Sequence, residues 1–135
     1  MRSAAALACI LGFIPAVAVQ QRGEAAGDPS RGEYIVENVA MCVQCHTPRN
    51  EAGDLLRSRL LQGAAVPFQS PYPGLRWANT APPIAGLPQY TLEEGVRLLT
   101  AGVTRTGTPL RPPMPPFRMR EQDARDVVSY LKSMK

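Results

Sequence analysis

Proline and glycine make up 25 of the 135 residues of this chain, 14 and 11 respectively, roughly half as many again as in average proteins. Seven prolines lie between residues 47 and 89, and five more lie between 107 and 117. Proline ends helices and is excluded from interior strands, so neither segment can form a long regular element. The length supports one domain, and only 6% of residues are aromatic. We therefore expect a loop-rich domain that gains stability from a large apolar group at its centre.

Two of the three segments with helical periodicity lie near the ends of the chain. Residues 31–41 predict a first helix, with Ser30 or Asp28 as its N-cap. Residues 121–134 predict a last helix, although Arg120 stands where a capping Ser or Thr is usual. The apolar stripe of this last helix consists of Ala124, Val127, Val128, Leu131 and Met134.

A middle helix is predicted from Thr91, which forms a capping box with Glu94. Its buried side would be formed by Val96, Leu98 and Leu99, and Gly102 is suited to end it in the left-handed conformation. The proline-rich segment after it, residues 107–117, is predicted to be a stiff extended loop. Because Met114 lies within it, we call this segment the methionine loop.

The N-terminus has the pattern of a secretory signal peptide. Arg2 is followed by sixteen mostly apolar residues, 4–19, and small residues at 16–18 offer a cleavage site after Ala18. The alternative is an uncleaved membrane anchor, but sixteen residues interrupted by Pro15 are fewer than the ~20 needed to span a bilayer. Cleavage is therefore favoured, and no stable membrane span is expected after processing. The predicted organisation is a signal peptide over 1–18, a flexible leader over 19–29 and one domain over 30–135.

The sequence Cys42-Val43-Gln44-Cys45-His46 has the C-x-x-C-H pattern of covalent haem c attachment, and His46 is the only histidine in the chain. Thiols three residues apart can form thioethers with the two vinyl groups on one edge of a porphyrin. The following imidazole can then bind the iron from below. The pattern predicts one covalent haem c, with His46 as an iron ligand.

Three other uses of these cysteines are less consistent with the sequence. A thioredoxin-type redox pair would follow a strand in a βαβ unit, and no such pattern surrounds Cys42 and Cys45. A structural zinc site needs four ligands, which the chain lacks once the signal peptide with Cys9 is removed. A disulfide between Cys42 and Cys45 would close too small a loop to contribute much stability.

With these features, the chain resembles the small monohaem class I cytochromes c over residues 30–134. The similarity rests on Gly32 and Tyr34 in the first helix, the 42–46 motif, Pro113-Met114-Pro115, and residues 126–133 of the closing helix. It implies an all-α fold of three main helices and long loops around one haem. It also implies that the first and last helices cross near Gly32 and Tyr130.

The resemblance and the rigid context favour Met114 as the second axial ligand, because a stiff loop loses little freedom when it holds a thioether at the iron. Three other methionines compete. Met41 adjoins Cys42 on the proximal side, Met119 lies close to the last helix, and Met134 occupies a packing position in that helix.

Further cofactor contacts are expected by analogy with the family. The Pro48 carbonyl could accept a hydrogen bond from Nδ1 of His46, a role for which Pro67 competes. Four side chains could reach the haem propionates: Trp77, Tyr90, Arg76 and Asn79.

The expected function is one-electron transfer in the periplasm rather than enzymatic catalysis. With His46 and Met114 both bound, the iron has no open position for a substrate. Redox proteins are the expected partners: a dehydrogenase, a terminal oxidase or another cytochrome, met by a soluble shuttle or held in a dehydrogenase complex. Basic residues are scattered without a run, so the net charge of +4 gives little support for nucleic-acid binding. The alternative is a haem-based ligand sensor or small peroxidase with an open distal site, which would follow if Met114 did not bind iron.

Overall fold

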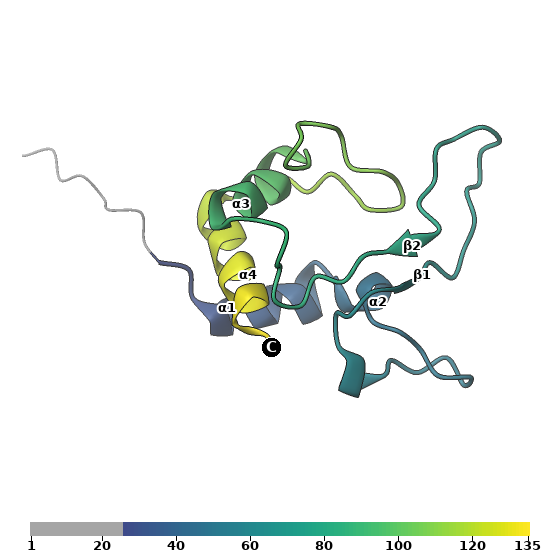
Figure 1. Ribbon diagram of the computed structural model, residues 1–135, viewed down its shortest axis with the longest axis horizontal. Helices are drawn as coiled ribbons and strands as arrows, with labels where there is room; N and C mark the ends of the chain where they lie inside the picture. Colours follow the sequence, from purple (N-terminus) through teal and green to yellow (C-terminus); the bar gives the residue numbers. More distant parts are fainter. Residues whose placement is uncertain (1–25) are drawn as a thin grey trace, which may run out of the picture.

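The computed structural model describes residues 26–135 and shows a mostly helical domain with long loops at one end (Figure 1). The predicted signal peptide, 1–18, and residues 19–25 of the predicted leader lie outside the described residues. The described helices are α1 (Pro29–Tyr34), the π-helical turn η1 (Ile35–Val39), α2 (Val43–His46), the 3₁₀ turn η2 (Arg57–Arg59), α3 (Leu92–Ala101) and α4 (Glu121–Ser133). The strands are β1 (Ala64–Ala65) and β2 (Thr80–Ala81).

The first helix begins two residues earlier than predicted and changes pitch along its length. Asp28 is the N-cap, and its carboxylate accepts hydrogen bonds from the backbone N–H groups of Ser30 and Arg31. The predicted single helix is α-helical only to Tyr34, after which η1 continues as a π-helical turn. A pitch change of this kind leaves no mark in the apolar spacing, because Ile35 and Val36 are buried in either form.

The crossing of α1 and α4 follows the expected close approach at Gly32. A β-carbon at Gly32 would collide with the backbone carbonyl of Asp126 and with Cβ of Tyr130. The carboxylate of Asp126 is 1% exposed, and it accepts a 2.8 Å hydrogen bond from the backbone N–H of Asp28 and pairs with Nε of Arg31 at 3.3 Å. A buried charge is tolerated only when it is paired in this way. The crossing therefore fixes the first helix against the last.

Helix α3 has both of the predicted ends. The side chain of Thr91 accepts a hydrogen bond from the backbone N–H of Glu94, and the carboxylate of Glu94 accepts one from the backbone N–H of Thr91. Gly102 ends the helix with φ of +71°, a conformation that costs glycine little. A β-carbon at Gly95 would lie 2.8 Å from Cγ2 of Val128, so α3 packs tightly on α4.

Helix α4 supplies most of the helical core. Ala124, Val127, Val128 and Leu131 are buried, and Met134 packs against them from the end of the helix. Arg120 is the N-cap residue and makes no side-chain cap bond, as expected from the sequence. Instead of a side-chain cap, two acidic residues in the first turn, Glu121 and Asp123, stabilise the N-terminus by interacting with the positive end of the helix dipole.

The long loop between α2 and α3 carries a small antiparallel ribbon. Ala64 pairs with Ala81 and Ala65 with Thr80. The loop is anchored by Leu61, which is fully buried and whose carbonyl accepts hydrogen bonds from the backbone N–H groups of Ile84 and Ala85. In Figure 1 the chain beyond the ribbon extends away from the helices, on the side of α2. This loop brings residues 78–84 back beside α2 and the C-x-x-C-H motif.

Within residues 26–135, no helix combines the length and apolar character that crossing a bilayer requires.

Candidate haem site

One cavity of about 360 Å³ lies between the helices and the two long loops. Its volume falls within the ~300–1,000 Å³ typical of cofactor and ligand pockets. The walls are largely apolar and come from α2, α3, α4, the end of the ribbon and the methionine loop. They include Cys42, Cys45, His46, Ile84, Leu98, Leu99, Val127, Val128, Leu131 and Met114. The structure thus brings together the motif and the methionine that the sequence singled out, which lie 68 to 72 positions apart.

Cys42, the N-cap residue of the short helix α2, and Cys45 within that helix both line this cavity. The turn of α2 is closed by backbone bonds from His46 N–H to Cys42 carbonyl at 2.9 Å and from Thr47 N–H to Val43 carbonyl at 3.2 Å. Both thiols are free rather than joined in a disulfide. Burial raises the pKa of the Cys42 thiol to about 11, so the thiol is neutral at physiological pH. Two adjacent, unpaired thiols on an apolar wall fit the thioether attachment that the motif predicts.

His46 is buried and oriented by a backbone acceptor. Its Nδ1 lies 2.7 Å from the carbonyl oxygen of Pro82, and only 5% of the residue is exposed. Burial lowers the pKa of His46, and the bond to Pro82 opposes that effect only in part. The neutral ring therefore keeps its proton on Nδ1, and Nε2 retains its lone pair for a metal.

The prediction that the Pro48 carbonyl accepts the hydrogen bond from Nδ1 of His46 was wrong. The Pro48 carbonyl accepts instead from the backbone N–H of Leu56 at 2.8 Å, and Pro67, the competing candidate, is exposed. Pro82 takes the role because the ribbon returns the chain to α2 there, and the carbonyl of His46 itself accepts from Gly63 N–H at 2.7 Å. No local pattern distinguishes Pro82 from the other prolines between residues 47 and 89, so only the ribbon pairing could have revealed it.

The methionine loop forms another part of the cavity wall, as expected for a second axial ligand. Pro113, Met114 and Pro115 all line the cavity. A turn is closed by the 3.2 Å bond from Met114 N–H to the Arg111 carbonyl, and the Pro112 carbonyl accepts from Ala78 N–H at 2.7 Å. The loop is thereby fixed both within itself and to the chain beside β2.

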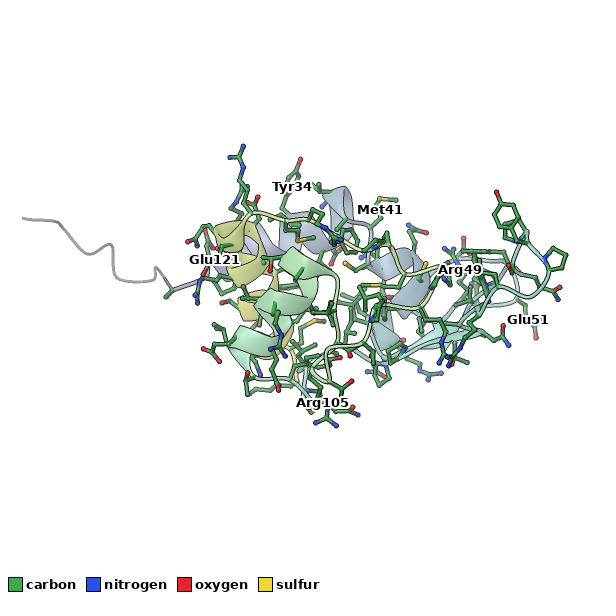
Figure 2. All side chains as sticks on the ribbon, turned by 90° about the horizontal axis from the view of Figure 1, so that it is seen from above. Tyr34, Met41, Arg49, Glu51, Arg105 and Glu121 are labelled. Carbon is green, nitrogen blue, oxygen red and sulfur yellow. The ribbon has the colours of Figure 1, made fainter. Side chains whose placement is uncertain are left out.

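Two of the three competing methionines lie outside the cavity. Met119 and Met134 pack against the hydrophobic core and do not line the cavity. Met41 does line it, directly before Cys42, and is 46% exposed (Figure 2 labels it at the outer surface). Its position in the chain places it beside the cysteines rather than on the methionine loop.

Of the four side chains expected near the propionates, the structure places only Tyr90 in the cavity wall. Trp77 instead packs edge-on against Phe68, with ring centres 5.9 Å apart, and donates its indole N–H to the Phe68 carbonyl. Arg76 and Asn79 are exposed and do not line the cavity. Trp77 lies away from the cavity because it braces the loop beyond the ribbon. Sequence reasoning missed Arg111, which lines the cavity three residues before Met114.

Among residues 26–135, no three His, Cys, Asp or Glu side chains cluster as they would at a zinc site. A cavity with two thiols, an oriented imidazole and a thioether in apolar walls suits a covalently bound haem.

Comparisons with known proteins identify the family of the chain. A diheme cytochrome c-type protein of Cereibacter sphaeroides is 44% identical to the chain over 45 residues, which are 33% of this chain. The matched part covers 15% of that relative's length. The sequence profile of the cytochrome c family matches residues 30–135, which include the motif, the methionine loop and all of the helices except the start of α1. The chain therefore belongs to the cytochrome c family, whose members transfer electrons through covalently bound haem c.

Proposed function

We propose that this protein is a periplasmic one-electron carrier that holds a single haem c through Cys42 and Cys45, with His46 and Met114 as the two axial ligands. The observation that carries the proposal is that these four residues line one apolar cavity. A single haem is proposed because the chain contains one C-x-x-C-H motif. The diheme character of the C. sphaeroides protein belongs to a chain of which this one spans only a small part.

When bound, haem supplies an iron that alternates between the ferric and ferrous states by one electron. The protein's own residues fix how that iron is held. The Pro82 carbonyl orients His46 and makes its ring a better donor, because the Nδ1–H bond increases electron density at Nε2. As a ligand, the soft thioether of Met114 would favour the ferrous state and so raise the potential.

His46 and Met114 both lie in surroundings that should keep their positions nearly the same in the two redox states. His46 is buried on the short helix α2, and Met114 lies between prolines in a loop with internal and external hydrogen bonds. Ligands held in stiff segments need little rearrangement when the iron changes charge. If His46 and Met114 both held the iron, no position would remain open for a substrate, which would favour electron transfer over the alternative of a ligand sensor or peroxidase.

Partner proteins would approach the edge of the cavity that carries the cysteines. Met41 precedes Cys42 and is 46% exposed, and Val39 and Tyr34 on the same segment are 59% and 58% exposed. Exposed apolar residues of this kind suit brief contacts below about 1,200 Å². A dehydrogenase, a terminal oxidase or another cytochrome would fit, whether the protein diffuses between them or remains bound to one.

Export to the periplasm is proposed from the N-terminal sequence alone, with cleavage after Ala18. Covalent attachment of haem c to an exported chain is consistent with this location in the periplasm. N-terminal sequencing of the mature protein would test the cleavage, because a protein that still contained residues 1–18 would exclude it.

The decisive test is a pyridine haemochrome spectrum with intact-mass measurement, on protein exported from a host that attaches haem c. We expect a c-type spectrum and the added mass of one haem. Ferric protein should also show the long-wavelength band of sulfur ligation and resist carbon monoxide after reduction. Absence of the added mass would refute the proposal, and ready carbon monoxide binding would refute ligation by Met114.

A further inference from the structure

The cavity wall contains a single residue with a permanent charge. Among the described residues that line it, only Arg111 is ionised, and no aspartate or glutamate is present. Tyr90, Thr80, Thr104 and Gln89 can offer neutral hydrogen bonds there. Haem carries two propionate carboxylates, and a neutral donor solvates such a charge without compensating it. Arg111 is thus the one cation in the wall that can compensate a carboxylate.

The guanidinium of Arg111 is not engaged elsewhere in the described chain. The ion pairs found among residues 26–135 are formed by Arg31, Arg57 and Arg125, and none involves Arg111. Its backbone, in contrast, is held by the turn to Met114. An arginine with an anchored backbone and an unpaired head beside a cavity is well suited to a planar anion, because its fork matches a carboxylate with two parallel bonds.

Arg111 is also mechanically linked to Met114. The Arg111 carbonyl accepts from Met114 N–H at 3.2 Å, and between them the Pro112 carbonyl accepts from Ala78 N–H at 2.7 Å. A side chain fixed at residue 111 therefore restricts the turn that carries the thioether. The pairing of a cofactor carboxylate with Arg111 would hold the methionine loop closed over the cavity.

We propose that Arg111 is the counter-ion of a haem propionate and that this pair fastens the loop that carries Met114. Arg111 acts as a positioning residue for Met114 and as a positive charge that disfavours the ferric state. The inference rests on the proposed function, because it takes haem as the ligand of the cavity. It adds the residue that couples the carboxylates of the cofactor to retention of its axial thioether.

The test uses the exported haem protein with Arg111→Gln, Arg111→Lys and the control Arg105→Gln. Arg105 is exposed at the lower edge of the molecule in Figure 2 and does not line the cavity, and its backbone carbonyl accepts a hydrogen bond from the side chain of Arg97. Two quantities are measured: the midpoint potential by spectroelectrochemistry, and the dissociation constant of imidazole from the ferric protein by absorbance titration.

We expect Arg111→Gln to lower the midpoint potential and to tighten imidazole binding roughly threefold to tenfold, because a partly exposed charge pair contributes modestly. Arg111→Lys should keep the potential near that of the wild type, since the charge remains, and should tighten imidazole binding less than Arg111→Gln does. Arg105→Gln should leave both quantities unchanged.

Two results would overturn the inference. If Arg111→Gln matches Arg105→Gln in both measurements, Arg111 pairs with no propionate. If the potential falls but imidazole binding stays at the wild-type value, the pair does not fasten the methionine loop. A wild-type protein without covalent haem would instead refute the proposed function, so the two failures are distinct.

Discussion

Nδ1 of His46 lies 2.7 Å from the carbonyl oxygen of Pro82, a residue 36 positions further along the chain. A carbonyl can only accept a hydrogen bond, so this contact assigns the ring proton to Nδ1 and leaves Nε2 for the cavity. The orientation of the imidazole is consequently set by the ribbon of β1 and β2, which returns the chain to α2. The loop that appears least structured in the sequence thus determines the geometry of the metal-binding side chain.

Replacement of Met114 by leucine should open an axial position while the covalent haem stays attached. Leucine conserves the volume of methionine, so packing should change little, but it removes the sulfur. We expect imidazole and carbon monoxide to bind at least about tenfold more tightly, which corresponds to ~1.4 kcal/mol. The measurement is an absorbance titration of the ferric and the reduced protein.

The matched control for that experiment is Met119→Leu. Met119 packs against the core outside the cavity, and its backbone N–H donates to the Leu99 carbonyl. Its replacement should leave ligand binding unchanged. Equal effects of the two substitutions would mean that Met114 is not the axial ligand.

The double variant Cys42→Ser/Cys45→Ser should fail to accumulate as a folded protein. Without the cofactor, a cavity of about 360 Å³ is left in the core. At ~24 cal/mol per Å³ of cavity, an upper figure because the cavity is partly open, the cost approaches ~9 kcal/mol, which is comparable with the stability of a whole domain. Near-ultraviolet circular dichroism and limited proteolysis would report the loss.

Cys45→Ser alone provides the comparison, because one thioether should remain and hold the haem in place. A double variant that folds cooperatively without haem would contradict the expectation that the cofactor completes the core.

The parts of this fold that follow local rules could be predicted from the sequence. The capping box of Thr91 and Glu94, the left-handed Gly102 and the apolar stripe of α4 each depend on residues within a few positions of one another. The attachment motif is local in the same sense. The predictions that failed concern contacts across long loops. Pro82 replaces Pro48 beside His46, and Trp77 packs on Phe68, because a short ribbon sets both positions and its two paired residues per strand are too few to leave a pattern.

Gly32→Ala should destabilise the protein by about 2–4 kcal/mol, because the added methyl group would collide with the Asp126 backbone and with Tyr130. The backbone carbonyl of α4 cannot move aside as a flexible side chain could. Urea unfolding of the haem protein, followed by circular dichroism, measures the change.

Gly53→Ala separates this collision from ordinary backbone strain. A β-carbon at Gly53 meets nothing within 4 Å, but its φ of +89° is unfavourable for alanine. A loss of ~1–2 kcal/mol is expected there. If Gly32→Ala costs no more than Gly53→Ala, the helix crossing tolerates a wider separation than the structure indicates.

Stability should decline at alkaline pH through Tyr130, whose phenol donates to Oε1 of Glu37 at 3.4 Å. Partial burial first, and then the negative charges of Glu37 and Glu33, raise the pKa of Tyr130 above its usual value of 10, although Arg57 opposes them. A raised folded-state pKa means that the folded protein retains this proton where the unfolded chain has lost it. The stabilisation is therefore complete below pH 10 and is lost as the pH rises through the folded-state pKa. Its size should stay below about 1 kcal/mol, because the side chain is partly exposed.

Urea unfolding at pH 8 and pH 11 should show a smaller decline in stability for Tyr130→Phe than for the wild type. Tyr34→Phe, at a tyrosine that is 58% exposed, should follow the wild type. Identical declines in Tyr130→Phe and the wild type would exclude Tyr130 as the source.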